Sequence, residues 1–329
     1  MGTGSCLKMN PSPIYLKSYK TGKLKSKIEE AYKILYSCTL CPNNCKVNRY
    51  EKKGSCRSGV LPVISDACAH FGEEPPLTGI KGSGTIFFSN CTLKCKYCQN
   101  YQISQSGLGK EITEEDLAND MLYLQKLSCH NINLVTPTHF VPQILKALSI
   151  AIESGLNVPI VYNTSGYESM NTLRLLDDIV DIYLPDIKYS DDEKAFKYSG
   201  IKNYTANNRI AIKDMFRQVG TLTVDGMGVA IKGLIIRHLV LPDRISGSFD
   251  SLKFLADEVS MDITISLMAQ YNPAHRAREF SEISRKITYS EYREVVNYAE
   301  KLRFNNLLTQ YIESSDNYLP DFSRDTPFI

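Results

Sequence analysis

Residues 83–98, SGTIFFSNCTLKCKYC, form the stretch of sequence that decides the fold. The run from Gly84 is rich in β-branched and aromatic residues and is bounded by glycine, so it predicts a short buried strand that ends at Cys91. Three thiols then follow on one loop, at Cys91, Cys95 and Cys98, with an aromatic residue, Tyr97, just before the third. This stretch therefore predicts a buried strand that leads directly into a ligand-bearing loop.

Strands and helices alternate along the rest of the chain. Thr113 followed by Asp116 is typical of a helix N-cap, while Pro142 suits a first helical turn and Gly155 a helix end. The predicted helices cover roughly 113–129, 142–155, 168–180, 205–219, 250–260 and 290–304, and the strands between them begin near Ile132, Val158, Asp181, Leu234 and Asp262. About six such units predict an α/β fold with a parallel sheet, either a full or partial barrel or a doubly wound sheet. In each architecture ligands collect beyond the carboxyl ends of the strands.

The cysteine loop offers three thiols where a closed metal site would use four. Zinc sites prefer a complete set of four ligands, and iron–sulfur clusters for electron transfer alone are normally held by four thiolates. No fourth cysteine follows nearby, because Cys129 lies about thirty residues on, in what we expect to be the last turn of the first helix, and is interpreted as a buried thiol. The loop therefore predicts an iron–sulfur cluster with one open iron, the alternative being a zinc loop or incidental core cysteines.

Composition excludes several classes of protein. The chain has 329 residues, 43% hydrophobic and 22% charged, with 38 Lys and Arg against 36 Asp and Glu, so it offers no general attraction to nucleic acid or anionic lipid. No signal segment and no apolar run long enough to span a membrane is evident, which predicts a cytoplasmic protein. Ten cysteines in a reducing compartment are expected to be metal ligands where they cluster and core residues elsewhere.

The spacing of the three cysteines matches the CxxxCxΦC signature of the radical S-adenosylmethionine (SAM) superfamily, in which Φ is aromatic. Further segments, among them CTLCPNNCKVNR, HFGEEPPLTGIKGSGTIFFSNC, NINLVTPTHFVPQI, VYNTSGYES, DIYLPDIKY, IRHLVLP and SLMAQYNP, resemble the uncharacterised relatives of pyruvate formate-lyase activating enzyme over residues 38–322. The resemblance implies a partial (β/α)6 barrel and a SAM-binding [4Fe-4S] cluster held by Cys91, Cys95 and Cys98.

The resemblance also implies an activity. In the superfamily the open iron chelates the amino and carboxylate groups of SAM, and the reduced cluster cleaves SAM to a 5′-deoxyadenosyl radical that abstracts hydrogen from a substrate. An electron donor such as flavodoxin or ferredoxin is then expected, and the substrate is either a protein, as in activation of a glycyl-radical enzyme, or a small metabolite or peptide. The alternative from another class is a non-enzymatic iron–sulfur or zinc module.

Polar residues at the ends of the second and third strands are candidate SAM contacts. Many members of the superfamily carry a GGE-like turn after the second strand, whereas this chain has Thr136, Thr138 and His139 there, whose hydroxyl and imidazole groups could accept from the SAM ammonium. After the third strand, Asn163 and Ser165 precede a glycine that allows close backbone approach. Simple loop and turn roles are the alternatives.

The fourth and later strands add charged candidates. Asp186 and Lys188 resemble the DxK of activating enzymes and, as alternate residues, share one face; the buried carboxylate requires a partner. Arg237 on the fifth strand and Tyr97 of the cysteine loop are further candidate SAM contacts. We expect four later residues either to line the mouth or to serve structural pairing: His238, Gln270, Tyr271 and Asn272. Glu73 and Glu74 are interpreted as solvated loop charges, the alternative being that they approach the active site.

A second cysteine set precedes the barrel. Cys38, Cys41, Cys45 and Cys56 form a closed group of four, which suits either a structural zinc or a second [4Fe-4S] cluster. Cys6 and Cys68 have no partners by spacing. We therefore expect a leader and a metal-binding segment with four cysteines over residues 1–80, a radical SAM partial barrel over 81–315 and a tail over 316–329.

Overall fold

The computed structural model describes residues 12–316, 319–324 and 326–328, and its centre is a mostly parallel sheet. All six predicted strands are present and run parallel to one another: β2 (Ser83–Phe88), β4 (Ile132–Val135), β5 (Ile160–Thr164), β6 (Ile182–Pro185), β8 (Ala230–Leu239) and β9 (Thr264–Met268). Their carboxyl ends therefore meet at one edge, where the cysteine loop begins.

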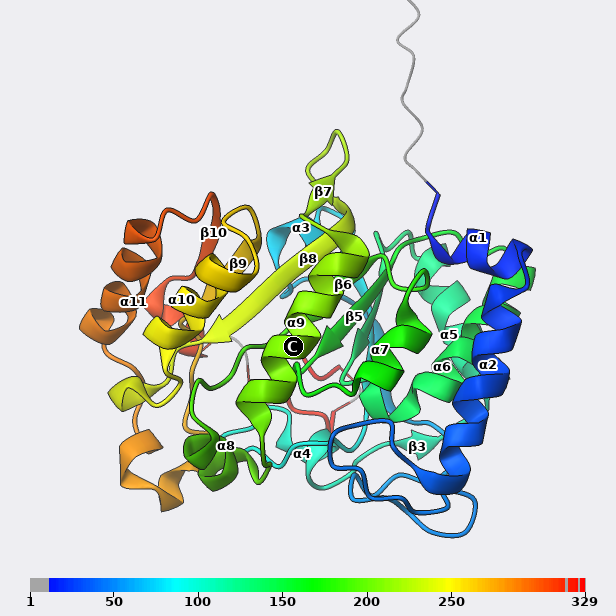
Figure 1. The fold of residues 1–329 in the computed structure, drawn as a ribbon, viewed down its shortest axis with the longest axis horizontal. Helices are drawn as coiled ribbons and strands as arrows, with labels where there is room; N and C mark the ends of the chain where they lie inside the picture. Colours follow the sequence, from blue (N-terminus) through cyan, green and yellow to red (C-terminus); the bar gives the residue numbers. More distant parts are fainter. Residues whose placement is uncertain (1–11, 317–318, 325, 329) are drawn as a thin grey trace, which may run out of the picture.

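The six predicted helices are also present and cover the sheet: α5 (Glu114–Lys126), α6 (Val141–Glu153), α7 (Met170–Leu176), α9 (Tyr204–Val219), α10 (Ser248–Glu258) and α11 (Tyr289–Lys301). Figure 1 shows them ranged along the sheet from α11 and α10 to α5. The predicted cap is confirmed, because Thr113 and Asp116 form a reciprocal capping box at the start of α5. One placement was wrong: α5 ends at Lys126, so Cys129 lies beyond the helix, although its thiol is buried as expected.

Four strands were not predicted; three extend the sheet at its two ends, and the fourth pairs beside β8. They are β1 (Val63–His70), antiparallel to β2; β3 (Lys110–Glu111), paired with β1; β10 (Asn306–Thr309), parallel to β9; and β7 (Thr223–Val224), paired with β8. The order β10-β9-β8-β6-β5-β4-β2-β1-β3 leaves β3 and β10 as separate edges, so the barrel is partial, as expected. Because β1 belongs to this sheet, the sheet continues across the boundary that we expected at residue 80.

The remaining elements lie around this barrel. The described part of the expected leader forms α1 (Tyr15–Lys20), α2 (Lys23–Ile34) and a 3-10 turn, Leu35–Ser37, and α2 contacts α6; Cys6 lies outside the described residues. Short helices are α3 (Pro75–Thr78), α4 (Tyr101–Ser104) and α8 (Asp192–Ser199), with further 3-10 turns at Thr138–Phe140, Pro242–Arg244, Ala277–Glu279, Ser281–Ile283 and Ile312–Asp316. Within the described ranges, no helix is long and apolar enough to cross a membrane.

A cluster of apolar side chains fills the barrel interior on the amino-terminal side of the polar strand ends. Leu77 of α3 is fully buried in one cluster with Val161, Leu184 and Ile235 of the strands. Since alternate strand residues share a face, the positions two residues further along these strands point to the same interior. Those positions are polar, at Asn163, Asp186 and Arg237, and they form the floor of the site described next.

Candidate functional site

Hydrogen bonds to carbonyl groups of α8, and one from the Arg276 N–H, fix the cysteine loop. The Lys94 N–H donates to the Ser199 carbonyl at 2.9 Å and the Lys96 N–H to the Tyr198 carbonyl at 2.8 Å, while the Lys96 carbonyl accepts from the Arg276 N–H at 2.8 Å. These bonds hold both sides of the central cysteine, Cys95. The loop is therefore positioned by the end of α8, an element that the sequence did not predict.

The Cys95 thiol is buried, those of Cys91 and Cys98 are half-buried, and each lies beside a polar hydrogen-bonding group. The Ser199 hydroxyl donates to the Cys95 Sγ at 3.0 Å, the Leu93 N–H donates to the Cys91 Sγ at 3.3 Å, and the Cys98 Sγ lies 3.1 Å from the Ser104 hydroxyl. Burial, and then the neighbouring Cys95, raise the pKa of Cys98 to about 11. Thiols in such a site ionise only when something stabilises the thiolates.

The donor set fits an iron–sulfur cluster. Thiolates are the ligands of such clusters, and hydrogen bonds to their sulfurs of the kind made here stabilise the charge. Burial raises the pKa of Cys91, and the other two thiols add to that effect, so the three sulfurs are close enough to interact. Among the residues that the structure describes, no group of three or more His, Cys, Asp or Glu is arranged to hold a metal ion directly.

Tyr97 anchors the cysteine loop through contacts with two other tyrosines. Its side chain is buried, its hydroxyl lies 2.7 Å from that of Tyr189, and its ring packs edge-on against Tyr271 at 5.8 Å between centroids. The Tyr189 hydroxyl in turn lies 2.8 Å from the Ser199 hydroxyl, which contacts Cys95. These contacts give Tyr97 a positioning role in this structure.

The Asp186 carboxylate has the partners that the sequence required. The Lys188 Nζ lies 2.6 Å from its Oδ2, and the Arg237 Nε lies 2.9 Å from its Oδ1. Burial raises the pKa of Asp186, but the charges of Arg237 and Lys188 outweigh that effect and hold the pKa below its ordinary value. Asp186 is therefore ionised at neutral pH and holds both cations at the ends of β6 and β8.

Glu73 and Glu74 are buried at this site, so their interpretation as solvated loop charges was wrong. The Glu73 carboxylate, 9% exposed, lies 3.7 Å from the Arg237 guanidinium and 3.5 Å from the Asn163 amide nitrogen. Burial raises the pKa of Glu74 to about 7, against the opposing charge of Arg237. Local sequence gave no signal for this, because the turn enters the barrel only where the unpredicted strand β1 ends at His70 and α3 begins at Pro75.

Two residues after β4 form hydrogen bonds with other parts of the protein. The Thr138 hydroxyl donates to Glu168 at 2.6 Å, and the His139 Nε2 lies 2.9 Å from the Ser89 carbonyl oxygen. Thr136 is half-buried, with a positive φ of 60°. The structure thus places Thr138 and His139 in buried networks that support the strand ends.

The residues after β5 divide between two surroundings. The Asn163 Oδ1 accepts from the Arg237 guanidinium at 2.6 Å and belongs to the charged floor. Ser165 is half-buried, and its carbonyl accepts from the Tyr204 hydroxyl at 3.1 Å. A Cβ on Gly166 would overlap the Asp186 carbonyl oxygen, so this glycine is required for packing of the β5 and β6 ends.

A cavity of about 740 Å³ lies over this floor. The cavity is lined by Asn163, Arg237 and Gln270 and by the two residues that follow the third cysteine. Described residues of the C-terminal segment, over 319–324 and 326–328, form one wall. That volume suits small-molecule ligands. The cavity therefore joins the cysteine loop, the charged floor and the C-terminal segment.

Three further candidates take structural positions. The His238 Nδ1 and Nε2 lie 2.7 Å from the Ile187 carbonyl oxygen and 2.8 Å from the Ser248 hydroxyl, so the ring is held away from the cavity. The Tyr271 hydroxyl donates to the Ile283 carbonyl at 2.6 Å, and the Asn272 amide donates to the Ser315 carbonyl at 3.2 Å.

The second cysteine set is folded around a buried arginine. Arg49 is 2% exposed, and its guanidinium donates to the Cys38 Sγ at 3.8 Å and to the His139 carbonyl at 3.1 Å. A Cβ on Gly54 would stand 3.3 Å from the Cys45 Sγ and 3.6 Å from the Cys56 Sγ. The glycine thus leaves a space between two thiols of the set that a larger residue would fill.

This second set adjoins the barrel loop. The Asn43 amide donates to the carbonyl of Thr92, the residue after Cys91, at 2.8 Å. The Leu40 carbonyl, between the first two cysteines, accepts from the Thr172 hydroxyl of α7 at 2.7 Å. The two cysteine sets are therefore neighbours in the folded chain.

A partial barrel whose strand-end loop carries the CxxxCxΦC cysteines defines a class of protein: the chain belongs to the radical SAM superfamily. The family profile that matches residues 85–238 carries the description Radical SAM superfamily. Such enzymes use an iron–sulfur cluster, SAM and a reductant.

Two individual curated proteins are similar to this chain in sequence. An uncharacterised protein of Methanocaldococcus jannaschii is 31% identical over 297 residues, which is 87% of this chain and 81% of that protein. The pyruvate formate-lyase-activating enzyme of Clostridium pasteurianum is 28% identical over 180 residues, which is 52% of this chain and 67% of that enzyme. The predicted resemblance is therefore confirmed at the level of the superfamily.

Solved structures are similar at a greater distance. SuiB of Streptococcus suis, bound to the precursor peptide SuiA, has a TM-score of 0.48 at 12% identity, with 72% of this chain and 50% of that chain covered. The hydrogenase maturase HydG of Carboxydothermus hydrogenoformans has a TM-score of 0.46 at 14% identity, with 68% and 52% covered. This chain spans about half the length of these two proteins.

Proposed function

We propose that this chain binds SAM at a cluster held by Cys91, Cys95 and Cys98 and directs the resulting radical to a substrate in the adjoining cavity. The observation that carries the proposal is the cavity itself, which joins the residues after Cys98 to the charged floor around Arg237. When bound and reduced, the cluster supplies the electron that cleaves SAM to methionine and a 5′-deoxyadenosyl radical. The protein binds the reactants, orients them and excludes water.

The charged floor suits the zwitterionic end of SAM. Lys188 and Arg237 supply cations for a carboxylate, with Asp186 holding both of them in place. Glu73 supplies a buried carboxylate for an ammonium, which the turn at residues 136–139 lacks. We propose that Asn163, Asp186, Lys188 and Arg237 contact or organise SAM, and that Thr136, Thr138, His139 and Ser165 shape the strand ends around it.

The cavity favours a substrate that fits beneath the C-terminal segment. Phe322 packs on Phe87 at 5.3 Å between ring centroids and Phe328 packs on His70 at 4.2 Å, so the side of the cavity near β1 is covered. A small metabolite or a short peptide can be enclosed there. Activation of a glycyl-radical enzyme is the second candidate, favoured by the similarity to pyruvate formate-lyase-activating enzyme.

We propose that Cys38, Cys41, Cys45 and Cys56 hold a second iron–sulfur cluster. The buried Arg49 supports an anionic occupant, because its guanidinium contacts carbonyl groups and Cys38 among the described residues, and a buried cation is costly unless a negative charge balances it. Four metal-bound thiolates provide that charge. The short path from Asn43 to Thr92 suits electron transfer from a donor such as flavodoxin or ferredoxin. A structural zinc is the alternative.

Anaerobic reconstitution with iron, sulfide, SAM and dithionite tests the proposal. We expect 5′-deoxyadenosine from the wild-type protein and none from Cys95→Ala, whose cluster lacks a ligand. Protein that holds a reduced cluster yet forms no 5′-deoxyadenosine would make the chain a non-enzymatic module instead. Iron and zinc analysis distinguishes the two occupants of the N-terminal set.

The substrate is tested separately. Electron paramagnetic resonance of reaction mixtures with a glycyl-radical enzyme encoded nearby should show a glycyl radical if the activase role is correct. Deuterium transfer from a small substrate into 5′-deoxyadenosine supports the enclosed-substrate role.

A further inference from the structure

A second cavity, of about 690 Å³, lies beside the start of the cysteine loop and shares no lining residue with the cavity over the charged floor. Its walls are the turn after Cys45, which carries Lys53 and Arg57, and the loop over 106–109 that follows α4. Asn90, which directly precedes Cys91, forms its base. None of these residues belongs to the SAM site proposed above.

Asn90 is the most informative residue of this cavity. It is 7% exposed, yet no hydrogen bond of its side-chain amide is found among the described residues. Its φ of 68° lies in the left-handed region, which asparagine tolerates better than most residues, and its N–H is held by the Ile103 carbonyl at 2.9 Å. The backbone therefore fixes an unpartnered polar group that faces the cavity.

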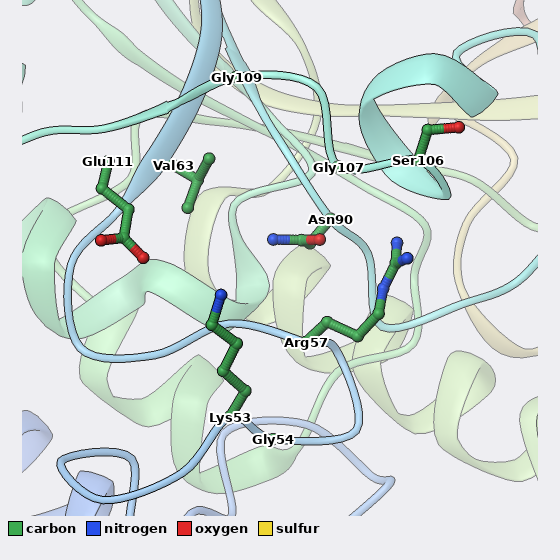
Figure 2. Close-up of a pocket in the computed structure, with 9 residues that line it drawn as sticks. All are labelled: Lys53, Gly54, Arg57, Val63, Asn90, Ser106, Gly107, Gly109 and Glu111. Carbon is green, nitrogen blue, oxygen red and sulfur yellow. The ribbon is translucent and has the colours of Figure 1, made fainter.

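Two cations accompany this amide. Figure 2 shows Lys53 and Arg57 on one loop, with Lys53 extending up from below Asn90 and the Arg57 guanidinium lying on the other side of Asn90, nearer the Gly107 loop. One N–H of the Arg57 guanidinium donates to the Ser104 carbonyl at 3.1 Å, so its other N–H groups are available to a ligand. Lys53 forms no ion pair within the described residues. With Glu111 as the one lining carboxylate, the cavity carries a formal charge of +1.

Glycines keep this space open. A Cβ on Gly107 would stand 3.2 Å from the Asn90 Oδ1, and a Cβ on Gly109 would overlap the Ser89 hydroxyl. Both glycines have positive φ values, of 75° and 150°, so side chains are disfavoured there by backbone and space alike. A Lys, an Arg and an amide around a glycine-lined space are typical of sites for phosphate groups.

We propose that this cavity binds a phosphate group, carried by a small molecule, between the two cysteine sets. Lys53 and Arg57 would neutralise the anion and the Asn90 amide would donate to one of its oxygens. A volume of 690 Å³ exceeds the needs of phosphate alone, so a phosphomonoester such as a nucleotide or sugar phosphate fits better than the free ion. Because its walls include Gly54, beside Cys45 and Cys56, and the residue before Cys91, the ligand would contact both metal-binding loops.

Isothermal titration of the anaerobic full-length protein with inorganic phosphate, ribose 5-phosphate, AMP and adenosine tests this proposal. We expect saturable binding of the phosphorylated probes and none of adenosine. Tighter binding of phosphate than of either ester would assign the free ion, and tighter binding of an ester would assign a phosphorylated metabolite. Both results support a phosphate site.

Neighbouring lysines provide a matched control. Lys52 and Lys53 are both exposed and carry the same charge, but only Lys53 lines the cavity. Lys53→Ala should weaken binding about tenfold, equivalent to ~1.4 kcal/mol, and Lys52→Ala should leave it within about twofold. Asn90→Asp should abolish binding, with the cluster spectrum as the check that the Cys91 loop is intact.

Three outcomes would overturn the proposal. They are absence of saturable binding to wild type, equal losses in the two lysine variants, and binding of an acidic electron carrier that Lys53→Ala weakens while none of the small anions binds. The last result would reassign this basic face to protein docking. Since the titration needs no SAM cleavage, failure here and failure of the proposed enzymatic function are distinguishable.

Discussion

Replacing Arg237 by glutamine should destabilise the protein strongly at neutral pH. The guanidinium lies 2.9 Å from Asp186, donates to Asn163 at 2.6 Å and lies 3.7 Å from Glu73. The substitution leaves two buried carboxylates with Lys188 as the remaining cation bound to Asp186. Breaking a buried ion pair by removing one partner costs about 3–5 kcal/mol, and we expect a loss in that range.

The loss should depend on pH with a definite sign. In the wild type the pKa of Asp186 is held below its unfolded value, so its stabilisation is present at neutral pH and is lost only as the pH falls through the folded pKa. Burial already raises the pKa of Glu73 in the wild type, and removing Arg237 takes away the charge that opposes burial at both carboxylates, so the folded pKa of each rises. The deficit of Arg237→Gln should therefore be largest near pH 7 and shrink toward pH 5.

Urea unfolding under anaerobic conditions at both pH values measures this effect. Arg217→Gln is the matched control, because Arg217 also binds two carboxylates, Asp214 at 2.7 Å and Asp177 at 3.1 Å, but is 58% exposed. Exposed pairs contribute about 0–1 kcal/mol. Equal losses in the two variants, or a deficit for Arg237→Gln that grows on acidification, would refute the reasoning.

The remaining predictions concern the two cysteine sets and one buried acid. Cys95→Ala should abolish 5′-deoxyadenosine formation, whereas Cys41→Ala should retain the barrel cluster, as read by iron content and the visible spectrum. Gly54→Ala should lose metal from the N-terminal set, because its Cβ would stand 3.3 and 3.6 Å from two sulfurs, while Gly59→Ala, with nothing within 4 Å, should keep it. Because burial raises the pKa of Glu74 from 4.5 to about 7, its ionisation costs stability as the pH rises through that range, and Glu74→Gln should lessen that decline in thermal melts.

The strands of the barrel could be predicted from the sequence because they are buried and apolar. Parallel strands buried on both faces are continuous apolar runs, and the caps at Thr113 and Gly155 mark where the helices between them begin or end. The strands β1 and β10 near the two ends of the sheet escaped prediction, since they are only partly buried and their residues are mixed in character. The short helix α8 escaped because it is only two turns long.

Candidate site residues could be predicted where a local spacing pattern marks them. They could not be predicted where the site depends on contacts between residues far apart in the sequence. The cysteines and the Asp186–Lys188 pair follow local patterns. Glu73 meets Arg237 across more than 160 residues of sequence, and Ser199 meets Cys95 across more than 100, so only the folded topology brings these groups together. Burial of the HFGEEPP turn depends on β1, which was not expected.

The C-terminal wall of the cavity is synthesised long after the cysteine loop. Phe322 is translated more than 200 residues after Cys98, which corresponds to roughly 10 to 45 s at about 5–20 residues per second. During that interval the cysteine loop has left the ribosome while the side of the cavity near Phe87 is still uncovered. The order of synthesis would therefore let the cluster that we propose for this loop be loaded before the C-terminal segment covers the cavity.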